Sequence, residues 1–179
     1  DYYIEITSLA CEYLEFDFIT LSEPIASTKG PVISPRDFRE LVLPQYHRLV
    51  SAYRQTKIPK IIFTSISNIK EILPAVVQTG IDGIWITQIM NAGIDYVRIG
   101  DQYPELALIG GIESITLLES TASVTKEVRK KAIPLLRRGR WLPALDDNVR
   151  MNTPYRNFLH YRKVLIECYE ESKKIKSGN

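Results

Sequence analysis

Seven polar residues follow apolar runs of the sequence, and their types could carry proton transfer or ligand binding. Glu23, Asp146 and Asp147 could act as acid/base groups or hold a hard cation such as Mg²⁺. The full set comprises Glu23, Ser65, Gln88, Glu113, Asp146, Asp147 and Arg150. If the apolar runs are parallel strands of one sheet, their carboxyl ends bring these residues to one face.

The elements that must position these residues repeat one pattern along the chain. At 61–63 the apolar run Ile-Ile-Phe gives way to Thr64 and Ser65, and Asn68 then begins a helical pattern. The same succession of strand, polar loop and helix predicts further strands at 16–21, 81–87, 106–112 and 141–145. This repetition is typical of a parallel α/β sheet.

Helical spacing and helix start signals predict the connecting elements. Ser34 with Pro35 predicts a helix start, Pro44 a break within that helix, and Ser123 the cap of a basic helix. The predicted helices are 2–14, 34–53, 68–79, 93–103, 123–138 and one beginning at 153, with a loop at 22–33 and a fraying tail at 173–179.

Composition sets the class of protein. The chain has 179 residues and a formal net charge of +2, which predicts one domain over 1–179 and no nucleic-acid partner. No apolar run approaches the roughly 18 residues of a membrane span. Cys11 and Cys168 lie in helical patterns, so we expect buried thiols in a reducing, cytoplasmic compartment.

Several of these residues also have a purely structural interpretation. An acidic pair such as Asp146-Asp147 at a strand end often caps turns and helix termini. His47 and His160 lie in helical patterns without a second ligand at metal spacing, which favours helix-face residues over catalysts. Gly110-Gly111 could admit a ligand to the backbone, but tight packing explains the pair equally well, and a dinucleotide-binding fingerprint is missing.

The number of predicted strands leaves two architectures open. A closed (β/α)₈ barrel needs eight strands and typically about 250 residues. Five parallel strands form either an open doubly wound sheet or part of a barrel, and the pattern alone does not separate these two possibilities.

Ordered segments of the chain resemble the uroporphyrinogen decarboxylase superfamily. Gly-Pro-Val-Ile-Ser-Pro-Arg-Asp-Phe at 30–38, running on to Leu-Pro-Gln-Tyr at 43–46, is similar to a helix entry of that family. Further similar segments follow in order at 68–73, 80–84, 108–112 and 152–158. The resemblance covers roughly 16–166 and implies an incomplete (β/α)₈ TIM-barrel fold. About five β/α units would lie in this chain, and the first three or so units of the whole barrel would lie before Asp1.

The resemblance implies two activities: decarboxylation of tetrapyrrole acetate side chains, or corrinoid-linked methyl transfer. The thiol-methyltransferase branch of the family binds zinc through a His-x-Cys and a later Cys, whose positions here hold Thr64, Ile66 and Asp147. These side chains are not the imidazole and thiolate ligands that such a zinc site uses. We therefore expect no cofactor and no zinc site of that kind.

Other departures from the family concern the catalytic groups. The decarboxylase branch has a His where Asp147 stands, many relatives have a Glu where Gln88 stands, and the principal catalytic Asp would precede Asp1. Relatives with Asp-Ser-Asp-Gly at the central loop share only Ser65 with this chain.

These observations lead to one set of expected site residues. Glu23 is expected as the acid/base group, Ser65 as a hydrogen-bond donor, and Asp147 as a third catalytic residue; the expected substrate contacts are Gln88, Gly110, Gly111 and Arg150. The expected partners are a small tetrapyrrole or corrinoid-linked substrate, and a second copy or the rest of the barrel. The alternative is a barrel that has lost catalysis and binds a ligand or a partner domain.

Overall fold

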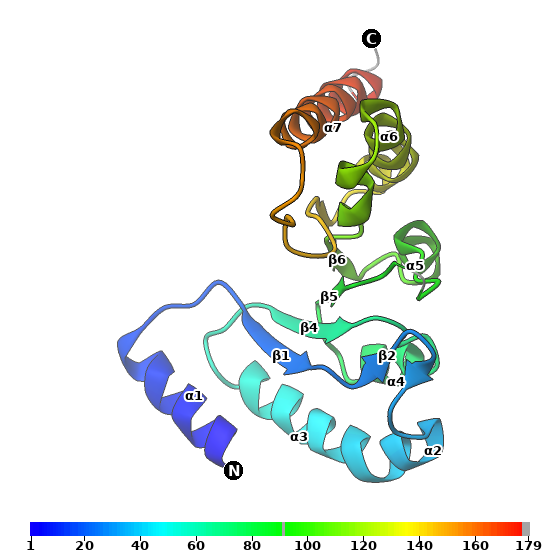
Figure 1. Ribbon diagram of the computed structural model, residues 1–179. Helices are drawn as coiled ribbons and strands as arrows, with labels where there is room; N and C mark the ends of the chain where they lie inside the picture. Colours follow the sequence, from blue (N-terminus) through cyan, green and yellow to red (C-terminus); the bar gives the residue numbers. More distant parts are fainter. Residues whose placement is uncertain (91, 177–179) are drawn as a thin grey trace. The chain divides into compact units, whose positions relative to one another are not determined.

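The computed structural model describes residues 1–90 and 92–176. The chain divides into two compact units, Asp1–Trp85 and Ile86–Asn179. Five strands form one sheet in the order β1-β4-β5-β6-β7, with helices between successive strands (Figure 1). The two strand pairs β1–β4 and β6–β7 are parallel, as the repeating pattern predicts.

In the first unit, β1 (Ile19–Glu23) pairs with β4 (Ile61–Ile66) from Ile19 opposite Ile61 to Glu23 opposite Ser65. The expectation of a strand at 16–21 is therefore wrong by about three residues. The strand begins where the Ile19 N–H donates to the Lys60 carbonyl at 2.9 Å. This shift places Glu23 at the last position of the strand.

The helices of this unit begin as the start signals predict. Ser34 caps α2 (Pro35–Asp37), its hydroxyl accepting from the Asp37 N–H at 3.0 Å. A π-helical turn, η1 (Phe38–Val42), then leads into α3 (Leu43–Arg54). Pro44 lies in the first turn of α3, directly after this π-helical turn. The break expected at Pro44 is thus a change from the π-helical turn η1 to the α-helix α3.

Two other segments of the first unit differ from expectation. The loop at 22–33 contains a small antiparallel hairpin of β2 (Ala26–Ser27) and β3 (Gly30–Pro31). The helix expected over 68–79 is only α4 (Leu73–Gln78), and Pro74 lies in its first turn. Pro74 therefore begins the helix, because proline is tolerated in the first turn and not in the interior.

The helix at the start of the chain, α1 (Tyr2–Tyr13), has no buried residue. It lies beside α3, as Figure 1 shows for the blue and cyan helices. Part of the core of this unit is aromatic. The ring of Tyr46 on α3 contacts the rings of Phe38 and Phe63, on η1 and β4, at centroid distances of 5.8 and 5.9 Å.

The remaining strands are short. β5 (Gly83–Thr87) agrees with the predicted strand at 81–87, whereas β6 (Ala107–Ile109) and β7 (Trp141–Leu142) cover only part of the predicted ones. Pro143 has no N–H to continue the ladder after Leu142. Pairing resumes as a single parallel bridge between Ile112 and Leu145.

The helices of the second unit are α5 (Tyr96–Gln102), the 3₁₀ turn η2 (Ser114–Leu118), α6 (Thr121–Arg138) and α7 (Tyr155–Lys176). Ser120, and not Ser123, caps α6: its hydroxyl accepts from the Ser123 N–H at 3.1 Å. Residues 173–176 of the expected tail are helical, and 177–179 lie outside the described residues.

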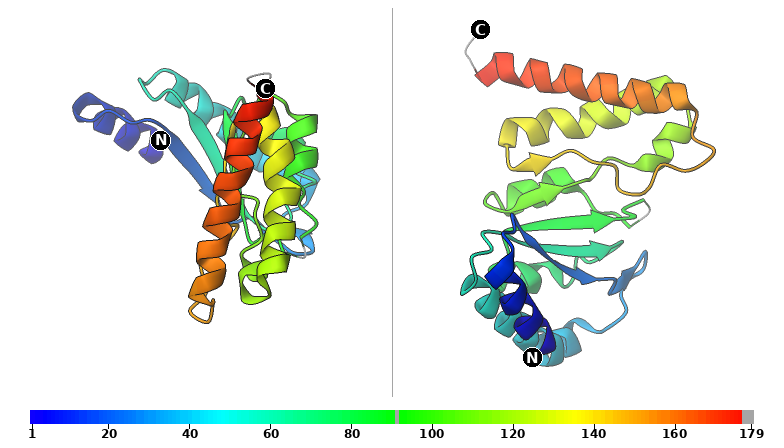
Figure 2. Two further views of the ribbon diagram at one scale, coloured as in Figure 1. Left: turned by 90° about the horizontal axis from the view of Figure 1, so that it is seen from above. Right: turned by 90° about the vertical axis from the view of Figure 1, so that its left-hand side faces the viewer.

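The core of the second unit lies between α6 and α7, which run side by side (Figure 2). Val124, Val128 and Ala132 of α6 pack with Tyr161 and Val164 of α7 in one buried cluster. The spacings of four residues on α6 and three on α7 place each set on one helix face.

Candidate functional site

Glu23 and Ser65 are the two expected site residues of the first unit, and the structure brings them together. They face each other at the carboxyl ends of β1 and β4. The hydroxyl of Ser65, which is buried, donates to the backbone carbonyl of Glu23 at 2.7 Å. This bond fixes the main chain at Glu23, while the Glu23 side chain stays partly exposed.

A buried tyrosine that the sequence analysis did not single out lies beside Glu23. Tyr46 of α3 is 4% exposed. Burial, and then the charge of Glu23, raise the pKa of the Tyr46 phenol far above its ordinary value. Among the described residues the hydroxyl has no hydrogen-bond partner. The one available signal was a phenol on the apolar stripe of α3 formed by Tyr46, Val50 and Tyr53.

The backbone is strained just beyond β4. Ser67 has a φ of 58°, which is unusual for a residue with a side chain, and it is buried. Its hydroxyl is without a hydrogen-bond partner among the described residues. The next residue is held by a bond from the Asn68 N–H to the Ser27 carbonyl at 3.1 Å. Strain of this kind costs about 1–3 kcal/mol and is concentrated at functional sites.

In the second unit, Asp146 joins the ends of three strands. Its carboxylate accepts from the Ile89 N–H at 3.1 Å and from the Ser114 N–H at 2.7 Å, and its carbonyl accepts from the Gln88 N–H at 2.8 Å. Asp146 is 2% exposed. These bonds confirm the capping interpretation for Asp146.

Asp147 differs from its neighbour. Its carboxylate accepts from the Asn148 N–H at 2.8 Å. The residue also lines a hollow of about 520 Å³ together with Asn148, Arg162 and apolar side chains of α7. Gln88, with a φ of 52°, and Arg150 are both exposed. Their roles toward a substrate stay predictions.

The two glycines after β6 are packed against aromatic rings. Gly110 accepts at its carbonyl from the Trp141 indole N–H at 2.8 Å. At Gly111 a Cβ would come within 2.6 Å of the Tyr96 ring. The Tyr96 hydroxyl in turn lies 2.8 Å from the Ile86 N–H and donates to the Ile109 carbonyl at 2.9 Å. Gly111 therefore has a packing reason to be glycine, and its contact with a substrate stays a prediction.

Glu113 belongs to a buried charge network that the sequence analysis missed. Lys131 of α6 is 5% exposed, and its ammonium lies 2.5 Å from Glu127 and 3.1 Å from Glu113. Glu127 also accepts from the Glu113 N–H at 3.0 Å. Because a buried charge must be paired, this network ties the segment after β6 to α6. The basic pattern of α6 gave no sign that one of its lysines is buried.

The histidines and cysteines lie in helices, as expected. Cys168 is buried, as also expected, whereas the expectation of a buried thiol is wrong for Cys11, which is only partly buried because α1 has no buried residue. His160 lies 2.7 Å from the Thr125 hydroxyl, which links α7 to α6, and burial raises the pKa of the Cys168 thiol. Over residues 1–90 and 92–176 there is no cluster of three or more His, Cys, Asp or Glu that could hold a metal ion. Within the same residues, no helix combines the length and the apolar character needed to cross a membrane.

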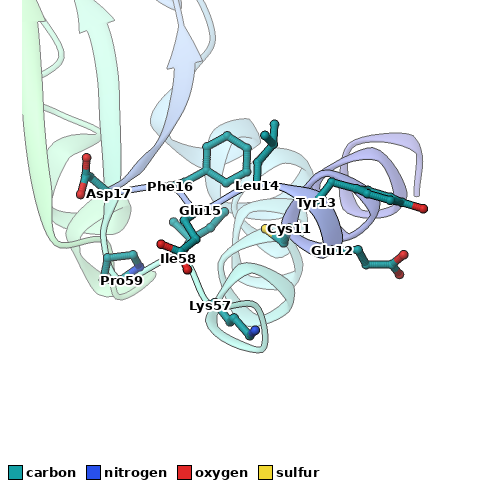
Figure 3. Close-up of a pocket in the computed structure, with 10 residues that line it drawn as sticks. All are labelled: Cys11, Glu12, Tyr13, Leu14, Glu15, Phe16, Asp17, Lys57, Ile58 and Pro59. Atoms are coloured by element: carbon teal, nitrogen blue, oxygen red, sulfur yellow. The ribbon is translucent and has the colours of Figure 1, made fainter.

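A separate hollow lies at the opposite end of the strands. Figure 3 shows this space of about 650 Å³, which is lined by residues 11–17 and 57–59 and includes Glu12, Glu15, Asp17 and Lys57. Asp17 precedes β1 and Pro59 precedes β4, so the hollow is at the amino ends of these strands. Parallel barrels place their chemistry at the carboxyl ends, so this hollow is not part of the expected site.

Comparisons with known proteins agree with the resemblance. The family model described as uroporphyrinogen decarboxylase (URO-D) matches residues 14–163. The uroporphyrinogen decarboxylase of Pseudoalteromonas atlantica strain T6c is 30% identical over 113 residues, which are 59% of this chain and 30% of that protein. A methyltransferase from Methanosarcina mazei has a similar structure, with a TM-score of 0.64 and 18% identity over 94% of this chain and 47% of that one.

The structural match and the parallel strands confirm the predicted α/β fold of (β/α)₈-barrel type, with five strands present. The chain spans less than half the length of either of these two proteins.

Proposed function

The chain belongs to the uroporphyrinogen decarboxylase family, and on that premise we propose that it acts in the decarboxylation of acetate side chains on a tetrapyrrole. The observation that carries this proposal is a carboxylate at a parallel strand end, Glu23, within a family match that covers 14–163. The Ser65 bond to its main chain supports a fixed backbone position for this group.

In the proposed reaction Glu23 is the acid/base group. Its carboxyl group donates a proton to the pyrrole α-carbon next to the carbon that carries the acetate side chain. The protonated ring then accepts the electron pair of the bond between the methylene and the carboxylate, and CO₂ leaves. A proton from solvent adds to the methylene carbon to give a methyl group, and Glu23 takes back the ring proton.

The other expected residues bind the substrate in this proposal. Ser65, Gln88 and Asp147 offer hydrogen-bonding groups, and Gly110 and Gly111 offer backbone at positions without side chains. Arg150 is an exposed cation and would pair with a substrate carboxylate. The reaction needs no metal or organic cofactor, and we place it in the cytoplasm.

The side chains at the three zinc-ligand positions favour decarboxylation over zinc-dependent methyl transfer. Thr64 and Ile66 lie on β4, and Asp147 follows β7, where the methyltransferase branch has its His, Cys and Cys. A threonine and an isoleucine do not replace a thiolate and an imidazole as zinc ligands. A non-catalytic barrel is the second candidate, and the absence of the branch-specific His at Asp147 favours it.

Product analysis separates these candidates. The protein is incubated with uroporphyrinogen, and in parallel with a methylated corrinoid and a thiol, and the products are identified by mass spectrometry. The proposal predicts porphyrinogens that have lost CO₂. Methylated thiol would support the methyltransferase alternative, and neither product would support the non-catalytic barrel and contradict the proposed reaction.

A further inference from the structure

The main chain at Gln88 is held in an unusual conformation. Gln88 directly follows β5, and its φ of 52° lies in the left-handed region that residues with a side chain rarely adopt. Two bonds to Asp146 hold this turn: the Gln88 N–H donates to the Asp146 carbonyl at 2.8 Å, and the Ile89 N–H donates to the Asp146 carboxylate at 3.1 Å. Both donors belong to the main chain, so the exposed carboxamide of Gln88 takes no part in these bonds.

Asp146 is itself fixed by the segment after β6. The Asp146 N–H donates to the Ile112 carbonyl at 2.8 Å, and the Ser114 N–H donates to the second oxygen of the Asp146 carboxylate at 2.7 Å. The residue is also buried. Because both carboxylate oxygens and both main-chain groups of Asp146 are bonded, the residue has one orientation, and it imposes the conformation found at Gln88.

Arg140 offers a comparison within the same unit. It is exposed, has a φ of 51° and precedes β7. Its guanidinium pairs with the Glu105 carboxylate at 2.8 Å and donates to the Glu105 carbonyl at 3.2 Å, so the Arg140 side chain contributes to the fold. The bonds at Gln88 would be made equally well by glycine, which adopts this conformation without strain. A glutamine at such a position therefore favours a role for its side chain in binding.

We propose that Asp146 is a positioning residue, which holds the main chain at Gln88 so that the Gln88 carboxamide binds a carboxylate of the substrate at the carboxyl end of β5. The carboxamide fits this ligand, because its NH₂ group donates hydrogen bonds and carries no charge that would repel an anion. Barrels of this type bind their substrates at the carboxyl ends of the strands. The choice of a tetrapyrrole as the substrate rests on the proposed function, and the hold of Asp146 on Gln88 does not.

A first test addresses the main chain without any ligand. In protein labelled with ¹³C and ¹⁵N, the backbone chemical shifts and the coupling between the amide and α hydrogens report the φ of Gln88. Asp146→Asn keeps the size of the side chain but turns an NH₂ group toward one of the two N–H donors, so we expect Gln88 to leave the left-handed conformation. Asp147→Asn, at the neighbouring carboxylate, should leave it in place. A Gln88 conformation unchanged in Asp146→Asn would overturn the positioning role.

A second test measures binding separately from turnover. Uroporphyrin, the oxidised and fluorescent form of the proposed substrate, is titrated with each variant to give Kd. Gln88→Gly and Gln88→Glu are each expected to raise Kd by about tenfold or more, the size of one hydrogen bond to a charged group. Gln88→Gly should melt no lower than the unaltered protein, because it relieves the left-handed strain. Arg140→Gly, the matched change at the other left-handed residue, should leave Kd unchanged. Equal Kd values in the unaltered protein and both Gln88 variants would overturn the inference.

A double variant shows whether Asp146 acts through Gln88. Asp146→Asn should raise the Kd for uroporphyrin several-fold in the unaltered protein, but not when residue 88 is already changed by Gln88→Gly, because the group that Asp146 positions is then absent. An equal increase in both backgrounds would mean that Asp146 acts on the fold alone, and it would overturn the positioning role.

These tests separate the inference from the proposed reaction. Uroporphyrin binding that depends on Gln88, in a protein that releases no CO₂ from uroporphyrinogen, would support the inference and contradict the reaction. CO₂ release together with a Kd that is independent of Gln88 would support the reaction and overturn the inference. Uroporphyrin that does not bind to the unaltered protein would overturn the carboxylate-binding role of Gln88.

Discussion

The backbone N–H of Ser114 donates to the carboxylate of Asp146 at 2.7 Å, although the two residues are 32 positions apart in the sequence. The other oxygen of the same carboxylate accepts from the Ile89 N–H. One buried side chain thus satisfies the two backbone donors that follow β5 and β6. The neighbouring carboxylate, Asp147, accepts instead from the N–H of the adjacent residue, Asn148.

Replacing Asp146 should therefore be far more costly than replacing Asp147. Asp146→Ala leaves two buried N–H groups without an acceptor, and we expect the free energy of unfolding to fall by about 2–4 kcal/mol. Asp147→Ala should lower it by no more than about 0.5 kcal/mol. Urea unfolding of both variants measures the difference. Equal losses would show that the Asp146 bonds do not stabilise the fold as described.

A pair of glycine variants separates packing from backbone strain. A Cβ added at Gly139 would meet nothing within 4 Å, but Gly139 has a φ of 81°. Gly139→Ala should therefore destabilise the fold by about 1–3 kcal/mol through backbone strain alone. Gly111→Ala has a φ of 94° and also collides with the Tyr96 ring, which should add about 1–3 kcal/mol. Thermal and urea unfolding compare the two. If Gly111→Ala costs no more than Gly139→Ala, the contact with Tyr96 is looser than the structure indicates.

Because Asp82 is stabilised in its ionised form, we expect the free energy of unfolding to fall at acid pH. Burial opposes its ionisation, but the Ile61 N–H, Arg54 and Lys60 outweigh burial and lower the pKa of Asp82. A lowered folded-state pKa stabilises the fold above the ordinary Asp value near 4, and that contribution is lost as pH falls through the folded value. Asp82→Asn should cost about 1.5 kcal/mol at neutral pH and progressively less toward acid. A cost that is constant with pH would contradict this linkage.

The first unit presents an apolar groove beside β1, and we predict association through it. Ile6, Ala10, Phe16, Phe18 and Ile58 are among the residues that line this groove of about 370 Å³. β1 is also the edge strand of the sheet, so its outer backbone groups are available for pairing. Light scattering during size exclusion should show assemblies that dissociate on dilution.

The same measurement on two variants locates the contact. Phe18→Lys places a charge in the groove and should weaken association, whereas Val32→Lys, at an exposed apolar position outside it, should not. A monomer at every concentration, or equal effects of both variants, would contradict the prediction.

Periodicity was sufficient to predict a parallel α/β sheet because it reports burial directly, whereas the barrel type came from the family resemblance. The runs around Ile61, Ile84 and Leu108 are buried strands, as their apolar composition predicts. The boundary of β1 was misplaced because Phe16 and Phe18 are apolar but exposed. Strand limits depend on the partner strand, and local composition does not contain that information.

The candidate site was only partly predictable for a related reason. Glu23 and Ser65 could be placed together because parallel strands bring their ends to one edge. Lys131 lies in a helix whose spacing shows which face is buried, but not that a lysine on that face would meet two carboxylates. Asp146 and Asp147 are adjacent and chemically identical, and only the fold distinguishes the one that binds the backbone.

The release of CO₂ from uroporphyrinogen by the unaltered protein and by Glu23→Gln tests the central claim most directly. Glutamine keeps the size of the side chain but neither gives nor takes the proton, so we predict CO₂ release by the unaltered protein and a rate at least about 100-fold lower in the variant. Circular dichroism should show the same fold for both proteins. No CO₂ from the unaltered protein, or equal rates from the two, would contradict the account.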